Sequence, residues 1–425
     1  MKKIFTNINK VIEYLIYIFV FLLAFQTRYI FRYLTLGANE FEYGKLSIYA
    51  SDIIFALIVF LFLCFKIKQI KTIKLDKQFL ICFLFLLICS INYFFASNLE
   101  MYFYYFLRII ECVAILFILQ FVKIDFKKLF IFFITSIVFH GIIGIFQFIN
   151  QNIEPNKYLG IAQHLSSAGG TSVLENCSGR FLRIYGGFTH PNVFGGFIVI
   201  AIIFLLILFF TDNNLNKKTR FSYFLISGFL LEVLFLTFSR SAFFALLICL
   251  FLLFIFQILK KSYKNLLVIS LFIFIICFIN IFIFKDLIYS RVLQEDRLEL
   301  KSISERSILN NQAYKLLENN WVSGVGLGNY IPHIYENINS KLDVWDYQPV
   351  HNVYLLILSE LGIWGLICYL LIFIYAIFNK IKQKNYLFIL PILIILIINF
   401  FDHYFWTSHS GIALSFLTPY FNNNI

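Results

Sequence analysis

The sequence predicts an all-α, polytopic membrane protein with about twelve transmembrane helices and one large extracytoplasmic loop that bears an amphipathic helix. The first observation is composition: of 425 residues, 60% are hydrophobic and 14% are charged, whereas a soluble domain averages about 45–50% apolar and about 25% charged. The second is the arrangement of the apolar residues in runs of about 20. A soluble globular enzyme and a disordered chain are excluded, because neither has so little polar surface.

The first apolar run, 11–27, follows Met1-Lys2-Lys3. Because no small-residue cleavage site follows it, we interpret it as a retained helix and not as a signal peptide. The stretch 221–259 is about twice as long as one span requires, so we expect it to fold back at Ser239-Arg240-Ser241. The other predicted spans are 46–65, 78–95, 101–122, 129–149, 190–211, 265–284, 350–378, 386–401 and the short run 409–422.

Basic residues lie in alternate short loops between the runs. With the N-terminus inside, each predicted inner loop carries three to five Lys or Arg residues, as the positive-inside rule requires. The net charge of +12 therefore has a topological explanation and does not indicate nucleic-acid binding. We expect a single transmembrane domain over 1–425, with both termini cytoplasmic.

Two predicted outer segments, 150–189 and 285–349, are long enough to be functional, since loops beyond about 12–15 residues in a compact protein are usually functional or disordered. Within the second, residues 302–320 repeat apolar residues at helical spacing. We expect an amphipathic helix there, lying against the membrane.

Arginines near the predicted outer face are candidates for binding phosphate, because ionisable groups next to apolar spans are costly and often functional. Arg183 and His190 precede a span, Arg240 lies at the tip of the apolar hairpin, and Arg306 lies near the start of the amphipathic helix. A guanidinium stays charged and binds phosphate oxygens with two parallel hydrogen bonds. The alternatives are a capped helix entrance for the first pair, snorkelling of Arg240 to water and a solvated helix face for Arg306.

His351 follows Pro349, the expected first residue of a helix, and therefore falls in the predicted first turn at the water boundary. An imidazole titrates near neutral pH, so it can accept a proton from an attacking hydroxyl. Its neighbour Asn352 is a secondary candidate. The alternative is an interfacial anchor without a chemical role.

Three further features receive structural interpretations. A tight re-entry turn explains Gly324-x-Gly326-x-Gly328 better than an anion-binding nest does. Arg108 and Glu111 are one helical turn apart in the fourth predicted span and are expected to pair, with Glu232 and Glu360 as further possible partners. We predict no metal, because no His or Cys converges in sequence with the carboxylates of the outer loop.

Several motifs together resemble the O-antigen ligase / O-antigen polymerase superfamily of bacterial membrane glycosyltransferases. They are the runs 183–192 (Arg-Ile-Tyr-Gly-Gly-Phe-Thr-His-Pro-Asn), 237–241, 304–307, 321–330, 349–355, 360–365 and 401–407. Their order and spacing carry the resemblance, which covers about residues 180–410; the preceding part is similar only in being hydrophobic helices.

The resemblance implies a metal-independent glycosyltransferase without cofactor, which moves a glycan from an undecaprenyl-pyrophosphate donor to an acceptor hydroxyl at the outer face of the plasma membrane. It places the pyrophosphate on Arg240, Arg306 and Arg183 and the base on His351, with His190 and Asn352 as secondary candidates. Direct attack would invert the anomeric carbon. The acceptor is expected to be a lipid A core, as in a ligase; a second lipid-linked repeat unit (a polymerase) and a protein side chain are alternatives.

Two other classes of protein remain possible. A lipid-linked oligosaccharide transporter would place polar groups near the bilayer midplane and would show repeat symmetry, whereas the polar cluster here is predicted at one face. A structural membrane subunit would tolerate changes at Arg240 and His351.

Overall fold

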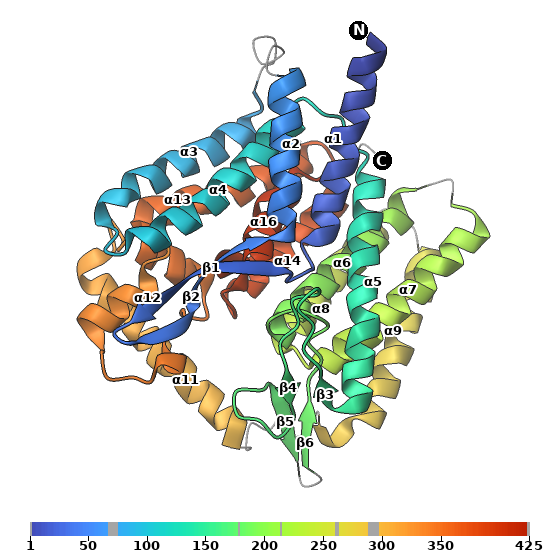
Figure 1. Ribbon diagram of the computed structural model, residues 1–425. Coiled ribbons are helices and arrows are strands. Elements are labelled where there is room, and N and C mark those ends of the chain that lie inside the picture. Colours follow the sequence, from blue (N-terminus) through green and yellow to red (C-terminus); the bar gives the residue numbers. More distant parts are fainter. Residues whose placement is uncertain are drawn as a thin grey trace.

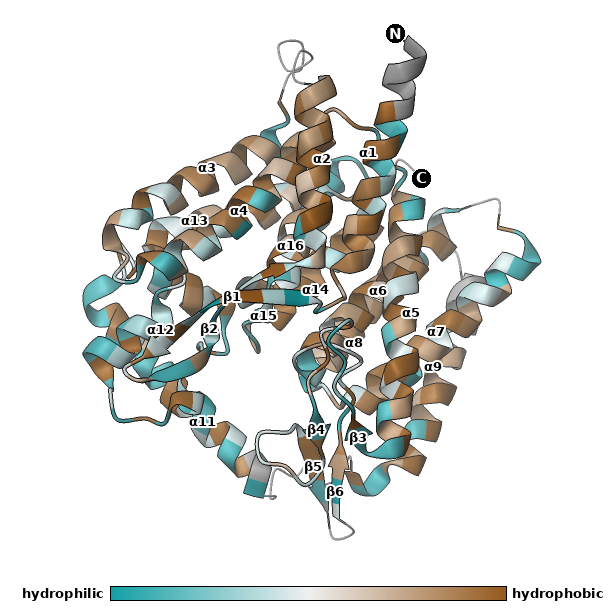
Figure 2. Ribbon diagram, in the orientation of Figure 1, coloured by the Kyte–Doolittle hydropathy of each residue, from teal (hydrophilic) through white to brown (hydrophobic). Residues whose placement is uncertain are grey.

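The computed structural model describes residues 2–66, 75–176, 179–212, 215–259, 263–287 and 297–422. Most of them are helical, and within this part of the chain seven helices are long and apolar enough to cross a membrane by length and composition. Shorter apolar helices lie at 50–65, 270–283 and 386–398. A largely helical membrane protein is therefore confirmed (Figures 1 and 2), while the number of twelve spans stays a prediction.

The N-terminal part contains a β-hairpin that we did not predict. Strands β1 and β2 pair antiparallel between α1 and α2, so the expected second span, from residue 46, in fact begins at Ala50. Gly37, with φ of 62°, begins the two-residue loop, where hairpin turns require positive φ. The elements are α1 Lys2–Leu22, β1 Arg28–Leu36, β2 Asn39–Tyr49, α2 Ala50–Lys66, α3 Lys77–Ile91, α4 Leu99–Leu119 and α5 Phe126–Asn150.

The first predicted outer loop is folded into two further small hairpins, β3–β4 and β5–β6. Their strands are Asn152–Ile153, His164–Leu165, Val173–Asn176 and Gly179–Leu182. These short strands lie at the end of the molecule opposite the start of α1 (Figure 1). The fold is thus mainly helical but not purely α.

The second half contains the predicted fold-back. Helix α7 ends at Thr237 and α8 begins at Arg240, which confirms the position of the turn. The chain turns without glycine, because Phe238 adopts a left-handed conformation with φ of 48°. The helices are α6 Pro191–Thr211, α7 Lys217–Thr237, α8 Arg240–Leu259, α9 Tyr263–Ile283, α11 Arg297–Asn320, α12 Tyr330–His333, α13 Val353–Lys382, α14 Leu390–Ile398, α15 Tyr404–Thr407 and α16 His409–Leu417.

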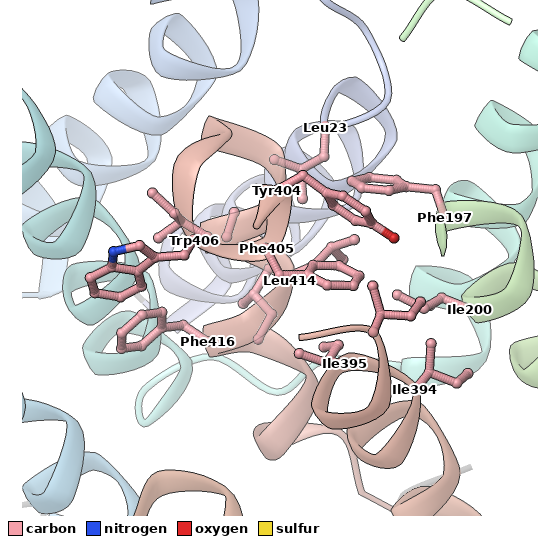
Figure 3. Packing of buried hydrophobic residues seen from close by; sticks show 14 of the residues in the cluster. Leu23, Phe197, Ile200, Ile394, Ile395, Tyr404, Phe405, Trp406, Leu414 and Phe416 are labelled. Atoms are coloured by element: carbon pink, nitrogen blue, oxygen red, sulfur yellow. The ribbon is translucent and has the colours of Figure 1, made fainter. Parts of the chain in front are cut away.

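Helix α6 forms the centre of the packing. It is apolar on all sides, as expected of a helix enclosed by others, and it packs against α5, α7, α8 and α14. Phe197 and Ile200 of α6 face the apolar side chains of α14, α15 and α16 (Figure 3). The start of α6, where Asn192 lies, is therefore held by a rigid core.

The predicted helix in the second outer loop exists and is longer than expected. Leu309, Ala313 and Leu316 of α11 are buried, and α11 packs against α13. Residues 288–296 of this predicted loop lie outside the described residues.

The glycine triplet follows α11 in the chain and makes a hydrogen bond to α13. All three glycines have positive φ, and the Gly326 N–H donates to the carbonyl of Glu360 over 3.0 Å. Opposite them, α13 is kinked at Gly362 (φ 66°, ψ −172°), where a Cβ would lie 2.1 Å from the carbonyl oxygen of Val322. The tight-turn interpretation is therefore correct, and the turn fixes α11 relative to α13.

Candidate active site

One large cavity, of about 2350 Å³, collects the predicted charged residues. Arg183, His190, Arg240, Arg306 and His351 all line it, although they come from four separate segments of the chain. A drug-sized ligand needs about 300–1,000 Å³, so this cavity has room for larger substrates. Asn352 is not among the lining residues; it caps α13 by accepting a hydrogen bond from Leu355 N over 3.1 Å.

His351 precedes α13 instead of lying in its first turn. The helix begins at Val353 with Asn352 as its N-cap, so the expectation drawn from Pro349 is wrong. The reason is that the side chain of the N-cap residue Asn352 outweighs the proline three residues earlier in fixing where the helix starts. His351 Nδ1 lies 3.6 Å from Oδ1 of Asp402, and its side chain keeps 24% exposure.

Asp402 is the central carboxylate of the site. Its Oδ1 accepts a hydrogen bond from its neighbour His403 N over 2.9 Å, and its Oδ2 accepts one from Asn192 Nδ2 over 3.0 Å. Burial acts to raise the pKa of Asp402, but His351 above all, with His403 and His190, holds the pKa well below its usual range. Asp402 is therefore an anion at any physiological pH, beside the imidazole of His351.

His403 is a second imidazole in the same group. Its ring centroid lies 4.9 Å from that of His351. Nδ1 lies 2.8 Å from Thr407 Oγ1 and Nε2 lies 3.4 Å from the hydroxyl of Tyr43. Burial, together with the charge of His351, lowers the pKa of His403 to about 3. His403 is therefore neutral at physiological pH, and His351 is the histidine of this pair with the greater access to the cavity.

Arg183 is hydrogen-bonded within the protein. Its guanidinium donates to Thr237 O over 2.8 Å, to Ser172 Oγ over 2.8 Å and to Asn192 Oδ1 over 2.6 Å. Burial, together with nearby Arg240 and Arg306, lowers its pKa to about 10. These contacts favour a role in holding Asn192 over direct binding of phosphate, and its predicted role as a pyrophosphate ligand stays a prediction.

Arg240 and Arg306 bring positive charge to the cavity from two different helices. Arg240 begins α8 and is exposed, whereas Arg306 lies on α11 and is partly buried. The two predicted phosphate ligands therefore reach the cavity that also holds His351.

His190 caps α6 by accepting the hydrogen bond of Asn192 N on Nδ1 over 3.1 Å. Burial and the charge of Arg183 lower the pKa of His190 to about 3. The capped-entrance alternative thus describes His190 well.

The ligand atoms of His351, Asp402 and His403 lie within 4.8 Å of one another, as a metal site would require. Within the described part of the protein both carboxylate oxygens accept hydrogen bonds and both ring nitrogens of His403 have partners, whereas His351 Nδ1 has no hydrogen-bond partner there.

A separate buried ion-pair cluster borders the cavity. Arg108 Nη1 lies 3.1 Å from Glu111 Oε2, as expected, and 2.6 Å from Asp52 Oδ1. The other suggested partners lie elsewhere: Glu232 accepts from Asn280 Nδ2, and Glu360 accepts from Trp406 Nε1.

Sequence reasoning did not single out Asn192, Asp402 and His403 as site residues. These residues lie in the runs 183–192 and 401–407, which carry the family resemblance. The sequence does not show that the two runs meet, because they are about 200 residues apart.

Comparison with known proteins finds a family that matches the part of the chain in which three of these site residues lie. Residues 223–370 match the family model of the O-antigen ligases, a region that contains Arg240, Arg306 and His351. No curated protein matches the chain. The match supports the resemblance seen in the sequence: this part of the chain is similar to the O-antigen ligases.

Proposed function

We propose that this protein is a metal-independent, inverting glycosyltransferase of the O-antigen ligase type. It transfers a glycan from an undecaprenyl-pyrophosphate donor to a hydroxyl of a lipid A core at the outer face of the plasma membrane. The convergence of Arg240, Arg306 and His351, with Asp402 beside His351, on one cavity supports the proposal. The match of residues 223–370 to the O-antigen ligase family model supports it independently.

The proposed reaction is a direct displacement. The acceptor oxygen forms a bond to the anomeric carbon, while the bond from that carbon to the pyrophosphate oxygen breaks and undecaprenyl pyrophosphate leaves with the electron pair. Arg240 and Arg306 stabilise the charge that develops on the leaving group, as preorganised donors do in water-poor sites.

His351 accepts the proton of the acceptor hydroxyl. The Asp402 carboxylate, 3.6 Å from Nδ1, stabilises the imidazolium that forms, which leaves Nε2 for the acceptor. A positioned general base contributes about 10²–10⁴-fold in rate. The step needs no further reactant, since the proton and the leaving group are both accounted for.

In this proposal the chain forms a single transmembrane domain, and the segments 150–189 and 285–349 lie outside the membrane on its outer side. The charged residues that line one cavity suit a lipid-linked substrate, whose headgroup meets the cations while its tail stays among apolar spans.

Replacing single site residues tests the assignment. We expect His351→Ala and Arg240→Ala to abolish glycan transfer while the protein still accumulates in the membrane, because neither residue belongs to the apolar core. The measurement is a glycan gel of a deletion strain complemented with each variant, with membrane levels read by immunoblot. Full transfer by either variant would refute the assigned roles.

The deletion strain itself separates the candidate functions. Accumulation of long lipid-linked polymer indicates a ligase, and single-unit glycans without a ladder indicate a polymerase. Donor left on the inner leaflet would indicate a transporter. Transfer by the purified protein after treatment with a chelator tests metal independence.

A further inference from the structure

A second part of the cavity wall is made of tyrosines. Tyr43 and Tyr49 come from β2, and Tyr104 and Tyr105 come from α4; all four line the cavity. We call these four residues the tyrosine wall. Tyr49 and Tyr105 are buried, whereas Tyr43 and Tyr104 are partly exposed to the cavity. Aromatic side chains at strand or helix spacing usually belong to a core, but these border an open space.

The wall begins next to the proposed base. The hydroxyl of Tyr43 lies 3.4 Å from Nε2 of His403, and the His403 ring packs 4.9 Å from that of His351. A ligand lying on the wall therefore ends at His351. This is where an acceptor hydroxyl must arrive if it is to lose its proton to that ring.

The buried ion-pair cluster holds the wall in place. Tyr49 N donates to Asp52 Oδ2 over 2.8 Å, and the ring of His409 stacks on the ring of Tyr49 at 4.7 Å. The guanidinium of Arg108 lies 5.0 Å from the ring centroid of Tyr104, and Arg108 also donates to Ser47 O of β2 over 2.7 Å. Buried charges are costly, and here they hold Tyr49 at the end of β2 and Tyr104 on α4 in place.

The charges near the wall are paired within the protein. Arg28 Nη2 lies 3.6 Å from Glu42 Oε1, and Arg108 pairs with Asp52 and Glu111. The cations proposed to meet pyrophosphate, Arg240 and Arg306, belong to other helices. The wall therefore offers flat apolar rings and hydroxyls without a strong net charge.

We propose that the tyrosine wall binds the sugar rings of the acceptor glycan, an assignment that rests on the proposed function. A pyranose ring has an apolar face of C–H groups and a rim of hydroxyls. A tyrosine matches both, because it combines an apolar ring with a polar tip. A bare phosphate or a lipid chain would use only one of these properties.

The test measures binding at the wall separately from binding at the arginines. Full-length protein in nanodiscs is titrated with two probes: the deacylated oligosaccharide released from the glycolipid of the cells that make the protein, and inorganic pyrophosphate. We expect Tyr104→Ala to weaken oligosaccharide binding about 3- to 10-fold, the size of a lost aromatic contact, and to leave pyrophosphate binding unchanged. Tyr104→Leu, which keeps apolar bulk but loses the flat ring, serves if the alanine variant does not fold.

Tyr29→Ala is the matched control, because Tyr29 lies on β1 of the same hairpin, is 71% exposed and does not line the cavity. It should bind both probes as the wild type does. Unchanged oligosaccharide binding by both Tyr104 variants, or equal weakening by Tyr29→Ala, would overturn the inference. If Tyr104→Ala weakens oligosaccharide binding but the wild type transfers no glycan, the wall is a saccharide site and the proposed function is wrong.

Discussion

At the scale of single residues, the site is organised around Asp402. A chain of contacts runs from Arg183 through Asn192 to Asp402 and reaches His351. Of these residues only Arg183 and His351 were expected from the sequence. Arg183 therefore contacts Asn192, and Asn192 in turn positions the carboxylate of Asp402.

Asn192 provides a test of this chain. We expect Asn192→Ala to lower kcat about 10-fold, because Asp402 loses a donor and hydrogen bonds to charged groups contribute about 1.5–3 kcal/mol. Asn192→Asp should be worse, about 100-fold, since it places a second carboxylate against Asp402. The donor KM should change little in both. Steady-state kinetics on purified protein measure this, and equal losses in the two variants would contradict an electrostatic role.

The pKa of His403 predicts how stability depends on pH. Burial holds this pKa at about 3, against about 6.5 for an unfolded histidine. Between these values the unfolded chain binds a proton that the folded chain does not, so stability falls as pH falls from about 6.5 towards about 3. Thermal unfolding in detergent should show a falling Tm on acidification, and His403→Gln should flatten that fall. If the Tm of His403→Gln falls with pH as steeply as that of the wild type, the His403 ring does not contribute to the pH dependence of stability.

At the scale of elements, the kink in α13 decides where Arg306 lies relative to His351. The kink needs a residue that tolerates positive φ with extended ψ, which is essentially glycine alone. It also needs the space that a missing Cβ leaves beside Val322 O. The contact between the glycine turn and Gly362 therefore joins α11, which carries Arg306, to α13, which follows His351.

Gly362→Ala should destabilise the protein strongly, because a Cβ would lie 2.1 Å from a backbone oxygen that cannot move aside cheaply. We expect loss of membrane accumulation or a Tm lower by several degrees, since a strained backbone residue costs about 1–3 kcal/mol. Gly169→Ala is the control, as a Cβ there would have nothing within 4 Å. Equal Tm values for the two variants would argue against the kink as a fixed joint.

At the scale of the whole molecule, the cavity is built by segments from both halves of the chain. The hairpin β1–β2 and α4 supply the tyrosine wall, whereas Arg183, Arg240, Arg306 and His351 come from the segment before α6, from α8, from α11 and from the segment before α13. The start of α1 and the last described residues lie near one end of the molecule, and β3–β6 lie at the other (Figure 1).

Labelling with a membrane-impermeant thiol reagent tests the predicted orientation. In intact cells, Tyr158→Cys should react, because Tyr158 lies in the predicted outer segment and is 75% exposed. Lys382→Cys, near the predicted inner end of α13, should react only after the cells are opened. The wild type, with its native cysteines, gives the background. The reverse pattern would place the cavity on the cytoplasmic side.

The sequence by itself determined the membrane class, the position of the fold-back at Arg240, the helix in the second outer loop and the resemblance to the O-antigen ligases. These follow from local composition and from motifs, which a linear chain displays directly. It did not reveal the β1–β2 hairpin, whose aromatic residues merge with the flanking apolar runs and so conceal the period of two.

Only the tertiary structure decided which groups meet. Asn192 and Asp402 are 210 residues apart in the chain, and Tyr43 and His403 are 360 apart. No local pattern encodes such pairs, because their contact depends on how α6, the hairpin and the segment before α15 pack together. The sequence therefore identified the chemical groups of the site, and packing determined their partners.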